Sequence, residues 1–190
     1  MPNWCSNVLE LEHSDPEMII RAHDAFKRGE LLNEFVPVPQ SLKDTVSGHF
    51  SDPEQQIRLE LQEICNQHDH GYRNWYDFCV NEWGTKWDVG GNDDAGSPDD
   101  GRLTLSFDSA WAPPVAFYEK MTQQGFNIRA YYYEPGCAFC GMFDSEYGDD
   151  CYDLSGMDAK EIRETIPEDL DEMFGIADDR ESWDNEDNEE

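Results

Sequence analysis

Hydrophobic and polar residues alternate over several short stretches of this 190-residue chain. In residues 7–12, NVLELE, Leu9 and Leu11 alternate with glutamates, which is the period of a half-buried strand. The same reasoning predicts further strands at residues 31–38, 85–89, 103–107, 126–133 and 138–143. We expect the second and third of these to form a hairpin, and the last two to pair across Pro135 and Gly136.

Apolar residues three and four positions apart predict helices between the strands. Ser14 begins a capping-box pattern for a helix that ends near Gly29, and Asp52 is placed to cap a helix from residue 53 to about residue 68. The apolar side of this second helix consists of Ile57, Leu61 and Ile64. Further helices are predicted at residues 74–83, 112–125 and 157–174, the last interrupted or restarted at Pro167. Gly84 stands where a left-handed residue would end a helix.

This order of elements predicts an α+β fold of ferredoxin-like type, with an antiparallel sheet covered on one face by helices. We assign residues 1–147 to this domain and residues 148–175 to an acidic helical extension. Residues 176–190 are rich in acids and Asn and leave only Trp183 to bury, so they are predicted to be a disordered acidic tail.

The formal net charge of −30, from 43 acids and 13 bases, narrows the class of partner. Nucleic acids are bound through basic groups that displace counterions, so direct nucleic-acid binding is disfavoured. A basic protein would be attracted, and its encounter accelerated at low salt. The acids expected to contact such a partner are Asp149, Asp150, Asp169, Asp171, Glu172, Asp178 and Asp179.

No targeting or membrane segment is recognised. Met1 is followed by neither a basic nor an apolar leader region, and no apolar run approaches the roughly 18 residues of a membrane span. Six cysteines in such a chain are expected to be reduced thiols, which predicts a cytoplasmic protein, the host cytoplasm if a phage encodes it.

Four strings of unusual residues suggest a family. They are MPNWCSN at residues 1–7, WYDFC with NEWGTKW at 75–87, FDSAWAPP at 107–114, and EPGCAFCG at 134–141. Together they resemble the YubB-like family of phage and plasmid proteins, which implies a ferredoxin-like fold and a mobile-element origin. In that family the last string has Glu, Gly, Phe and Gly at fixed spacing, here Glu134, Gly136, Phe139 and Gly141. Its two cysteines fall at variable positions, which argues against a metal site common to the family.

Individual chemical candidates are weak. Cys137 and Cys140 form a C-x-x-C pair, but zinc needs two further ligands, for which Cys151 and either Cys5 or a histidine are the available groups, so an inert pair is favoured. His68 and His70 are expected to be solvated. Paired carboxylates, including Asp93 with Asp94, are too abundant to indicate catalysis, and Asn92 to Gly96 lacks the spacing of a calcium loop. No catalytic residue, metal or cofactor is predicted.

Two functions are the main hypotheses from the sequence, and a third possibility is an intracellular protein that senses or sequesters cations. The leading hypothesis is a non-enzymatic accessory protein of a phage or plasmid that binds a basic host protein, in its concrete form a DNA mimic that counteracts host defence. The alternative is an enzyme or small-ligand-binding protein that uses an aromatic pocket around Trp83, Lys86, Trp87 and Trp111, with Lys86 holding an anion. Against the pocket, Trp83 and Trp87 are expected to be buried at a helix–strand junction, with Lys86 pointing the other way.

Overall fold

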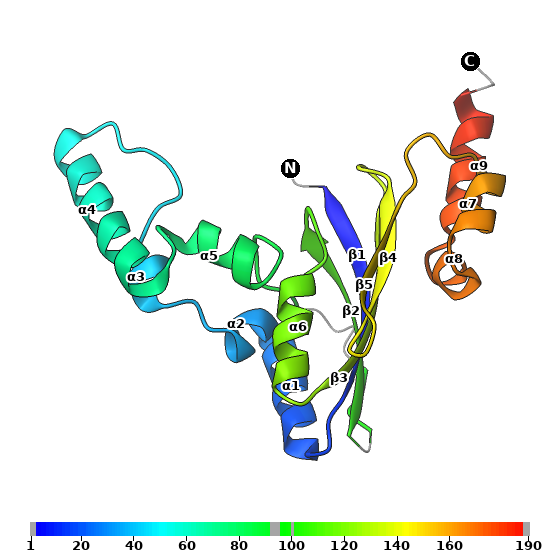
Figure 1. Ribbon diagram of the computed structural model, residues 1–190, viewed down its shortest axis with the longest axis horizontal. Helices are drawn as coiled ribbons and strands as arrows, with labels where there is room; N and C mark the ends of the chain where they lie inside the picture. Colours follow the sequence, from blue (N-terminus) through cyan, green and yellow to red (C-terminus); the bar gives the residue numbers. More distant parts are fainter. Residues whose placement is uncertain (1–2, 92–95, 100, 188–190) are drawn as a thin grey trace.

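The fold is built on one antiparallel sheet of five strands, in the order β2-β1-β3-β4-β5 (Figure 1). The computed structural model describes residues 3–91, 96–99 and 101–187. The strands are β1 (Trp4–Glu12), β2 (Arg102–Ala110), β3 (Asn127–Glu134), β4 (Phe139–Asp144) and β5 (Gly148–Asp153). The predicted α+β class is thereby confirmed, as is the pairing of β3 with β4 across the Pro135 turn. The acidic pair Asp93 and Asp94 lies outside the described residues.

One face of the sheet is covered by helices that precede β4 in the chain. They are α1 (Pro16–Arg28), α2 (Leu31–Phe35), α5 (Trp75–Glu82) and α6 (Val115–Gln123). Leu9 and Leu11 on β1 pack with Ile19 and Phe26 of α1 and Phe117 of α6 in a single apolar cluster. Asp15, and not the predicted Ser14, caps α1 through its side chain, and Gly29 ends the helix at φ 73°.

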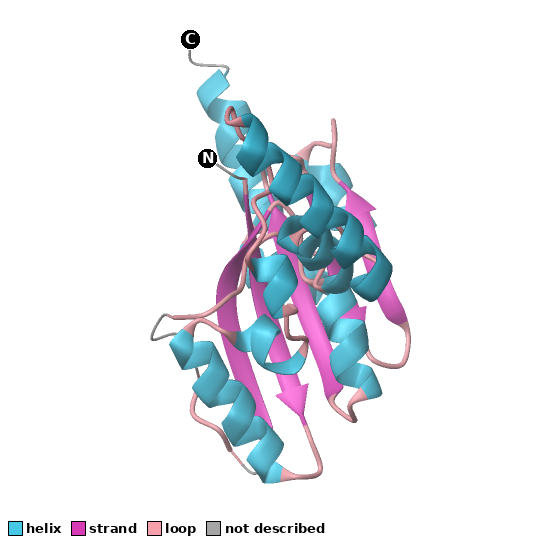
Figure 2. Ribbon diagram, turned by 90° about the vertical axis from the view of Figure 1, so that its left-hand side faces the viewer, coloured by secondary structure: helices cyan, strands magenta, loops and turns pink. Residues whose placement is uncertain are grey.

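The other face of the sheet is covered as well, by helices of the segment predicted to be an acidic helical extension. The C-terminal helices are α7 (Ala159–Thr165), α8 (Glu168–Phe174) and α9 (Ile176–Asp187). Their buried residues, among them Ile162 and Leu170, pack with Tyr131 and Cys140 of the sheet in a second apolar cluster. Figures 1 and 2 show these helices on the side of the sheet away from α1 and α6.

The C-terminal third differs from the sequence prediction at two further points. The boundary predicted at residue 147 falls directly before β5, an acidic strand without hydrophobic alternation that forms through its pairing with β4. Charged residues on an edge strand discourage pairing with other chains. Helix α9 occupies most of the segment predicted to be disordered, because Ile176 and Ala177 are buried and Arg163 of α7 bonds to Asp178.

Two predicted strands are absent from the middle of the chain. Residues 31–38 begin with helix α2, and residues 85–89 form a bend that leads to β2 without joining the sheet. β2 therefore pairs with β1, with Leu105 opposite Leu9, and not with residues 85–89 as the hairpin prediction required. Leu31, Leu32, Phe35 and Val36 are all buried in the core, at the spacing of a helix and not of a strand.

Helices α3 (Gln40–Lys43) and α4 (Pro53–His70) form an arm beyond α5 (Figure 1). Asp52 caps α4 as predicted, because its side chain accepts a hydrogen bond from the backbone N–H of Gln55 at 2.9 Å. The predicted apolar side of α4 is exposed to solvent, which the sequence did not indicate. Within the described ranges, no helix is long and apolar enough to cross a membrane.

The Glu-Gly-Phe-Gly pattern at the β3–β4 turn has structural roles. Glu134 is buried, and its two carboxylate oxygens accept hydrogen bonds from the backbone N–H groups of Gly136 and Cys137. A Cβ atom on Gly141 would lie 2.3 Å from the hydroxyl of Tyr132 and 2.5 Å from the carbonyl of Asp150. Glu134 and Gly141 therefore help to specify the shape of the hairpin.

We predict that Gly141→Ala destabilises the protein by about 1–3 kcal/mol, because the added methyl overpacks a site bounded partly by backbone. Urea denaturation followed by far-UV circular dichroism measures the change. Gly48→Ala is the matched control, because the nearest atom to its Cβ would be 3.9 Å away. Equal stability of the two variants would contradict this account of the glycine.

Candidate functional site

Residues from stretches far apart in the chain meet at one end of the sheet, where β1 begins and β2 ends. The side-chain amide of Asn7 on β1 donates to the hydroxyl of Ser109 on β2 at 2.9 Å. Beyond β2, the backbone N–H of Trp111 donates to the carbonyl of Asn3 at 3.0 Å. These bonds bring three of the four strings that carry the family resemblance to one place, since the β3–β4 turn also reaches Asn3 through Cys137.

The fourth string joins this end through the residues that follow α5. Trp83 is buried, as predicted, and its indole N–H donates to the carbonyl of Val36 at 2.9 Å. Gly84 has φ 89°, and a Cβ atom there would lie 3.1 Å from the backbone nitrogen of Val115. The hydroxyl of Thr85 then donates to the carbonyl of Ala110 at 2.9 Å. The segment is thus fixed between α6 and the end of β2.

Trp87 and Lys86 lie differently from the prediction. Trp87 was expected on a buried face, but 40% of it is exposed, and its ring centroid is 6.0 Å from that of Trp4. Lys86 does not point away from it: the ammonium lies 4.7 Å from the centroid of the Trp87 ring and 5.8 Å from that of Tyr76. The prediction assumed the alternation of a strand, and no strand forms here.

Asp88 connects this segment to helix α2. Its carboxylate accepts hydrogen bonds from the backbone N–H groups of Leu32 at 2.7 Å and Asn33 at 3.0 Å, two donors that the first turn of a helix leaves without an internal partner. Burial raises the pKa of Asp88 above its ordinary value, while these backbone donors act in the opposite direction. Asp88 therefore caps the N-terminus of α2 from a position distant in the sequence, which explains why residues 31–35 are helical.

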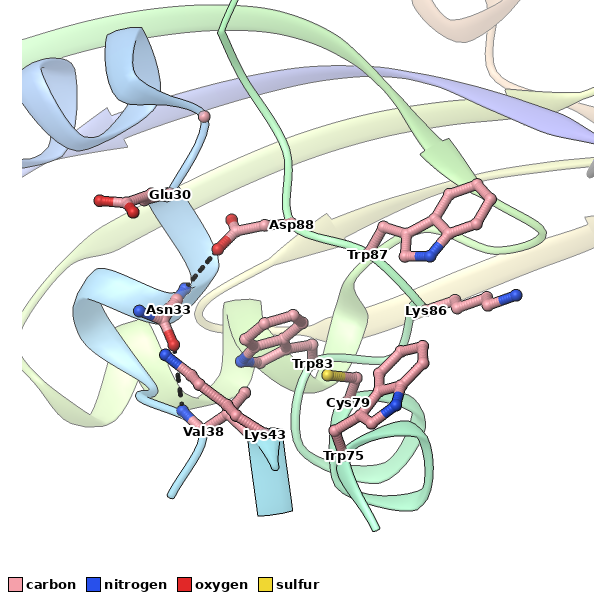
Figure 3. Close-up of a pocket in the computed structure, with 11 residues that line it drawn as sticks. Glu30, Asn33, Val38, Lys43, Trp75, Cys79, Trp83, Lys86, Trp87 and Asp88 are labelled. Atoms are coloured by element: carbon pink, nitrogen blue, oxygen red, sulfur yellow. Dashed lines mark hydrogen bonds between the residues drawn. The ribbon is translucent and has the colours of Figure 1, made fainter. Parts of the chain in front are cut away.

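A pocket of about 430 Å³ opens beside this connection (Figure 3). Trp75, Trp83 and Trp87 supply aromatic surface, and Cys79 and Val38 supply smaller apolar groups. The polar residues that line it are Glu30, Asn33, Lys43, Lys86 and Asp88. In Figure 3, Asp88 and Glu30 lie at one side, whereas Lys86 lies at the opposite side between the rings of Trp87 and Trp75, with its ammonium directed away from the two acids.

The two lysines distinguish this pocket electrostatically. Many basic residues of the chain pair with a carboxylate, as Arg21 does with Glu34 at 2.7 Å. Within the part of the chain that the structure describes, neither Lys43 nor Lys86 forms an ion pair, although the protein is strongly acidic. Rings and unpaired ammonium groups suit a ligand that combines a flat apolar part with a negative charge.

The pocket offers little for covalent chemistry. Burial raises the pKa of the Cys79 thiol to about 12, so the thiol stays protonated at neutral pH and is a poor nucleophile. Glu82, which follows it on α5, is engaged by the hydroxyl of Tyr72 and the ammonium of Lys120. The ion pair of Glu82 with Lys120 connects α5 to α6.

Trp111 is the fourth residue predicted for the pocket, and the structure places it outside the lining. It has φ 73°, is 50% exposed, and follows Ala110, the residue paired with Trp4. The structure thus brings Trp83, Lys86 and Trp87 together around the pocket and leaves Trp111 on the adjacent surface. Trp4, Trp87 and Trp111 are all substantially exposed, so indole surface is accessible at this end of the sheet.

The acids predicted for partner binding divide into two groups. Asp149 and Asp150 on β5 accept hydrogen bonds from the hydroxyls of Tyr132 and Tyr152, and Asp171 accepts from the backbone N–H of Ala177 at 2.8 Å. Asp178 bonds to Arg163 at 2.6 Å. Burial raises the pKa of Asp149. The second group consists of Asp169, Glu172 and Asp179, which are exposed and take no part in the hydrogen bonds named above.

The cysteine and histidine candidates are dispersed. Cys140 is buried, which raises its thiol pKa to about 12, while Cys137 and Cys151 are exposed. Across residues 3–91, 96–99 and 101–187, no group of three or more potential ligands is placed to hold a metal ion. His68 contacts its neighbour Asp69, and His70 contacts the hydroxyl of Ser41 at 3.0 Å.

Sequence reasoning missed several residues of the pocket. Lys43, Glu30 and Asn33 lie outside the segment from which the pocket was predicted, and no spacing connects them to Trp83. Asp88 could have been found, because it directly follows the NEWGTKW string and ends the turn that Gly84 begins. Its role as a distant cap depends on a contact across 55 residues, which a local pattern cannot indicate.

A family model described as "Ferredoxin-like domain in Api92-like protein" matches residues 82–180, just over half of the chain. The chain belongs to this family. The matched region begins at the segment that builds the pocket and includes four of the strands and helices α6 to α8, so the ferredoxin-like prediction is confirmed. The YubB-like assignment and the phage or plasmid origin remain proposals.

Among solved structures, the chain is similar to the crystal structure of a protein api92 from Yersinia pseudotuberculosis. The two are 13% identical with a TM-score of 0.44, over 83% of this chain and 99% of that one. No curated protein matches the chain.

We predict that Asp88→Ala lowers the free energy of unfolding by about 1–2 kcal/mol, because the N–H groups of Leu32 and Asn33 lose their acceptor. Urea denaturation monitored by tryptophan fluorescence measures the loss. Glu119→Ala removes the same charge from an exposed position on α6 and should change stability by less than about 0.5 kcal/mol. An equally small effect at Asp88 would show that α2 forms without this cap.

Proposed function

We propose that this protein is a non-enzymatic binding protein whose acidic C-terminal helices dock on a basic, nucleic-acid-binding protein. One observation carries the proposal: the acids of α7, α8 and α9 lie on helices whose other side is packed on the sheet. Exposed acids of these helices include Glu164, Glu168, Glu172 and Asp179, while Ile162 and Leu170 are buried. The charges are therefore held in a fixed arrangement and not on a loose tail.

The C-terminal segment has the charge that such docking needs. Residues 144–190 contain 20 acids and three bases, a net charge of −17. One of these bases, Arg163, is already paired with Asp178 and Glu181, and another, Lys160, lies 3.6 Å from Glu164. A fixed array of this sign attracts a basic surface from a distance and accelerates association at low salt.

The concrete form of the proposal is a DNA mimic. Carboxylates fixed along α7 to α9 and on β5 occupy the nucleic-acid site of a host defence or regulatory protein, where they contact the Lys and Arg residues that would bind phosphates. The YubB-like resemblance supports this interpretation, since a phage or plasmid protein meets host defence proteins in the host cytoplasm. Charge on the remainder of the chain adds to the long-range attraction.

The test is binding to nucleic-acid-binding proteins from a bacterial lysate. We expect the immobilised protein to retain them at low salt, to release them at high salt, and to lose them when duplex DNA is added as a competitor. Retention of no nucleic-acid-binding protein at low salt would refute the DNA-mimic function.

A variant with the four acids of α7 to α9 neutralised, Glu164→Gln, Glu168→Gln, Glu172→Gln and Asp179→Asn, should bind the retained protein about tenfold more weakly at low salt. A matched control loses four exposed acids elsewhere, at Glu17, Asp24, Asp69 and Glu119. Under the proposal the control weakens binding much less, and Lys86→Ala is nearly silent. Equal weakening by both fourfold variants would mean that only total charge matters.

The second candidate function is the binding of a small aromatic anion in the pocket beside Trp87. The observation that favours it is the pair of lysines, Lys43 and Lys86, which line the same pocket and have no carboxylate partner among the described residues. A ligand ring would stack on the exposed indole while its negative group contacts an ammonium.

For this second function we expect an anilinonaphthalene sulfonate probe to bind the protein. Lys86→Ala or Lys43→Ala should lower the affinity for the probe several-fold, since each removes one cationic contact. Probe fluorescence against concentration measures the affinity. Lys27→Ala is the control, because Lys27 is an exposed lysine on α1 outside the pocket. Identical affinities for all three variants would remove the pocket from consideration.

A further inference from the structure

Helix α4 presents an apolar stripe to solvent, formed by Ile57, Leu61 and Ile64. These side chains are 57%, 59% and 67% exposed. They repeat at intervals of four and three residues, so they lie on one side of the helix. On the opposite side, Leu59 and Asn66 are buried at 5% and 3% exposure. The helix therefore has two apolar sides. The smaller one, with Leu59, packs against the protein, and the larger one, the stripe, faces solvent.

The orientation of α4 is fixed by polar contacts on its inner side. The side-chain amide of Asn66 donates to the carbonyls of Ser41 at 3.1 Å and Arg73 at 3.2 Å. Gln62 donates to the same carbonyl of Ser41 at 2.8 Å. A rotation that buried the stripe would break these bonds and expose Leu59. The stripe is thus a stable surface of the folded chain, on an arm that Figure 1 shows far from α7 to α9.

Acids border the stripe. At 100° per residue, Glu60 lies along one edge and Glu54 along the other, with Glu63 beyond Glu60. On the same side as Glu54, Cys65 and Arg58 also flank the stripe, and His68 continues it one turn beyond Ile64. Three glutamates and one arginine therefore border the stripe, a net negative charge that favours basic residues at the edges of a partner's apolar surface.

A second copy of this chain fits the stripe poorly. An antiparallel pairing of two α4 helices about Leu61 would bring the Glu60 residues of both copies close together. Each copy also has a net charge of −30, so long-range repulsion opposes the encounter. A basic amphipathic helix avoids both costs.

We propose that the α4 stripe docks an amphipathic helix of a partner protein whose apolar side is flanked by Lys and Arg. The apolar contact supplies the affinity, as in other helices that bind through residues at i, i+4 and i+7, and the acids select the charge of the partner. This surface is separate from the acidic C-terminal helices, so the inference goes beyond the proposed function and does not depend on it.

The test uses the full chain and two designed helical peptides of about 18 residues, the length of α4. Both have Leu at positions i, i+4 and i+7; one has Lys on either side of the leucines, and the other has Glu at the same positions. Fluorescence anisotropy should show binding of the Lys peptide and none of the Glu peptide. Leu61→Gln should weaken binding of the Lys peptide about tenfold or more, since it removes a central apolar contact.

Matched variants distinguish binding at the stripe from binding elsewhere on the acidic surface. Ile20→Gln changes an apolar residue on α1 that is 43% exposed, and it should leave the affinity unchanged. Because Leu61 is exposed, its replacement should not alter the thermal unfolding midpoint, which checks the fold. The inference is overturned if Leu61→Gln and Ile20→Gln bind the Lys peptide equally. It is also overturned if neutralising the acids of α7 to α9 abolishes peptide binding while Leu61→Gln does not, or if light scattering shows a dimer that Leu61→Gln dissociates.

Discussion

Strand β3, in the middle of the sheet, has buried residues on both faces, and the remaining architecture follows from this constraint. Ala130 and Tyr131 are neighbours on β3, yet they belong to different apolar clusters on opposite sides of the sheet. A sheet with two apolar faces needs two covering layers. Helices α1 and α6 form one layer, and α7 to α9 form the other. The second layer comes from the most acidic part of the chain, so the same packing that completes the core also fixes an array of carboxylates on the outside.

On the face covered by α1 and α6, the hydrogen bonds of Asp88 likewise stabilise the fold and position surface residues at the same time. By accepting two hydrogen bonds from the start of α2, this residue orders a helix and also the bend that presents Lys86 and Trp87. Trp83 is buried a few residues earlier with its indole N–H satisfied by Val36, so the bend is attached at both ends. An aromatic surface can then remain exposed without collapsing into the core, because the backbone that carries it is held by buried polar contacts.

Local patterns in the sequence were sufficient for elements whose signals are local. The alternation of β1, the cap at Asp52 and the glycines after α1 and α5 each predicted a boundary that the structure contains. Elements that depend on distant contacts were missed: α2 needs Asp88, β5 needs β4, and α9 needs the sheet and Arg163. The residues of the candidate site also separate into those that local sequence could identify and those that it could not. Trp83, Lys86 and Trp87 could be identified together because they are close in sequence, whereas Lys43 and Glu30 reach the pocket only through the fold.

The exposed apolar surfaces and the high charge of this protein are connected physically. Exposed residues such as Leu61 and Trp111 would favour self-association in a neutral protein. A net charge of −30 opposes contact between identical copies and so keeps these surfaces available. The same charge lowers the energy of contact with basic molecules. Under the functions proposed here, the acidity disfavours association with identical copies and with other acidic molecules, and the apolar surfaces add affinity for a basic partner.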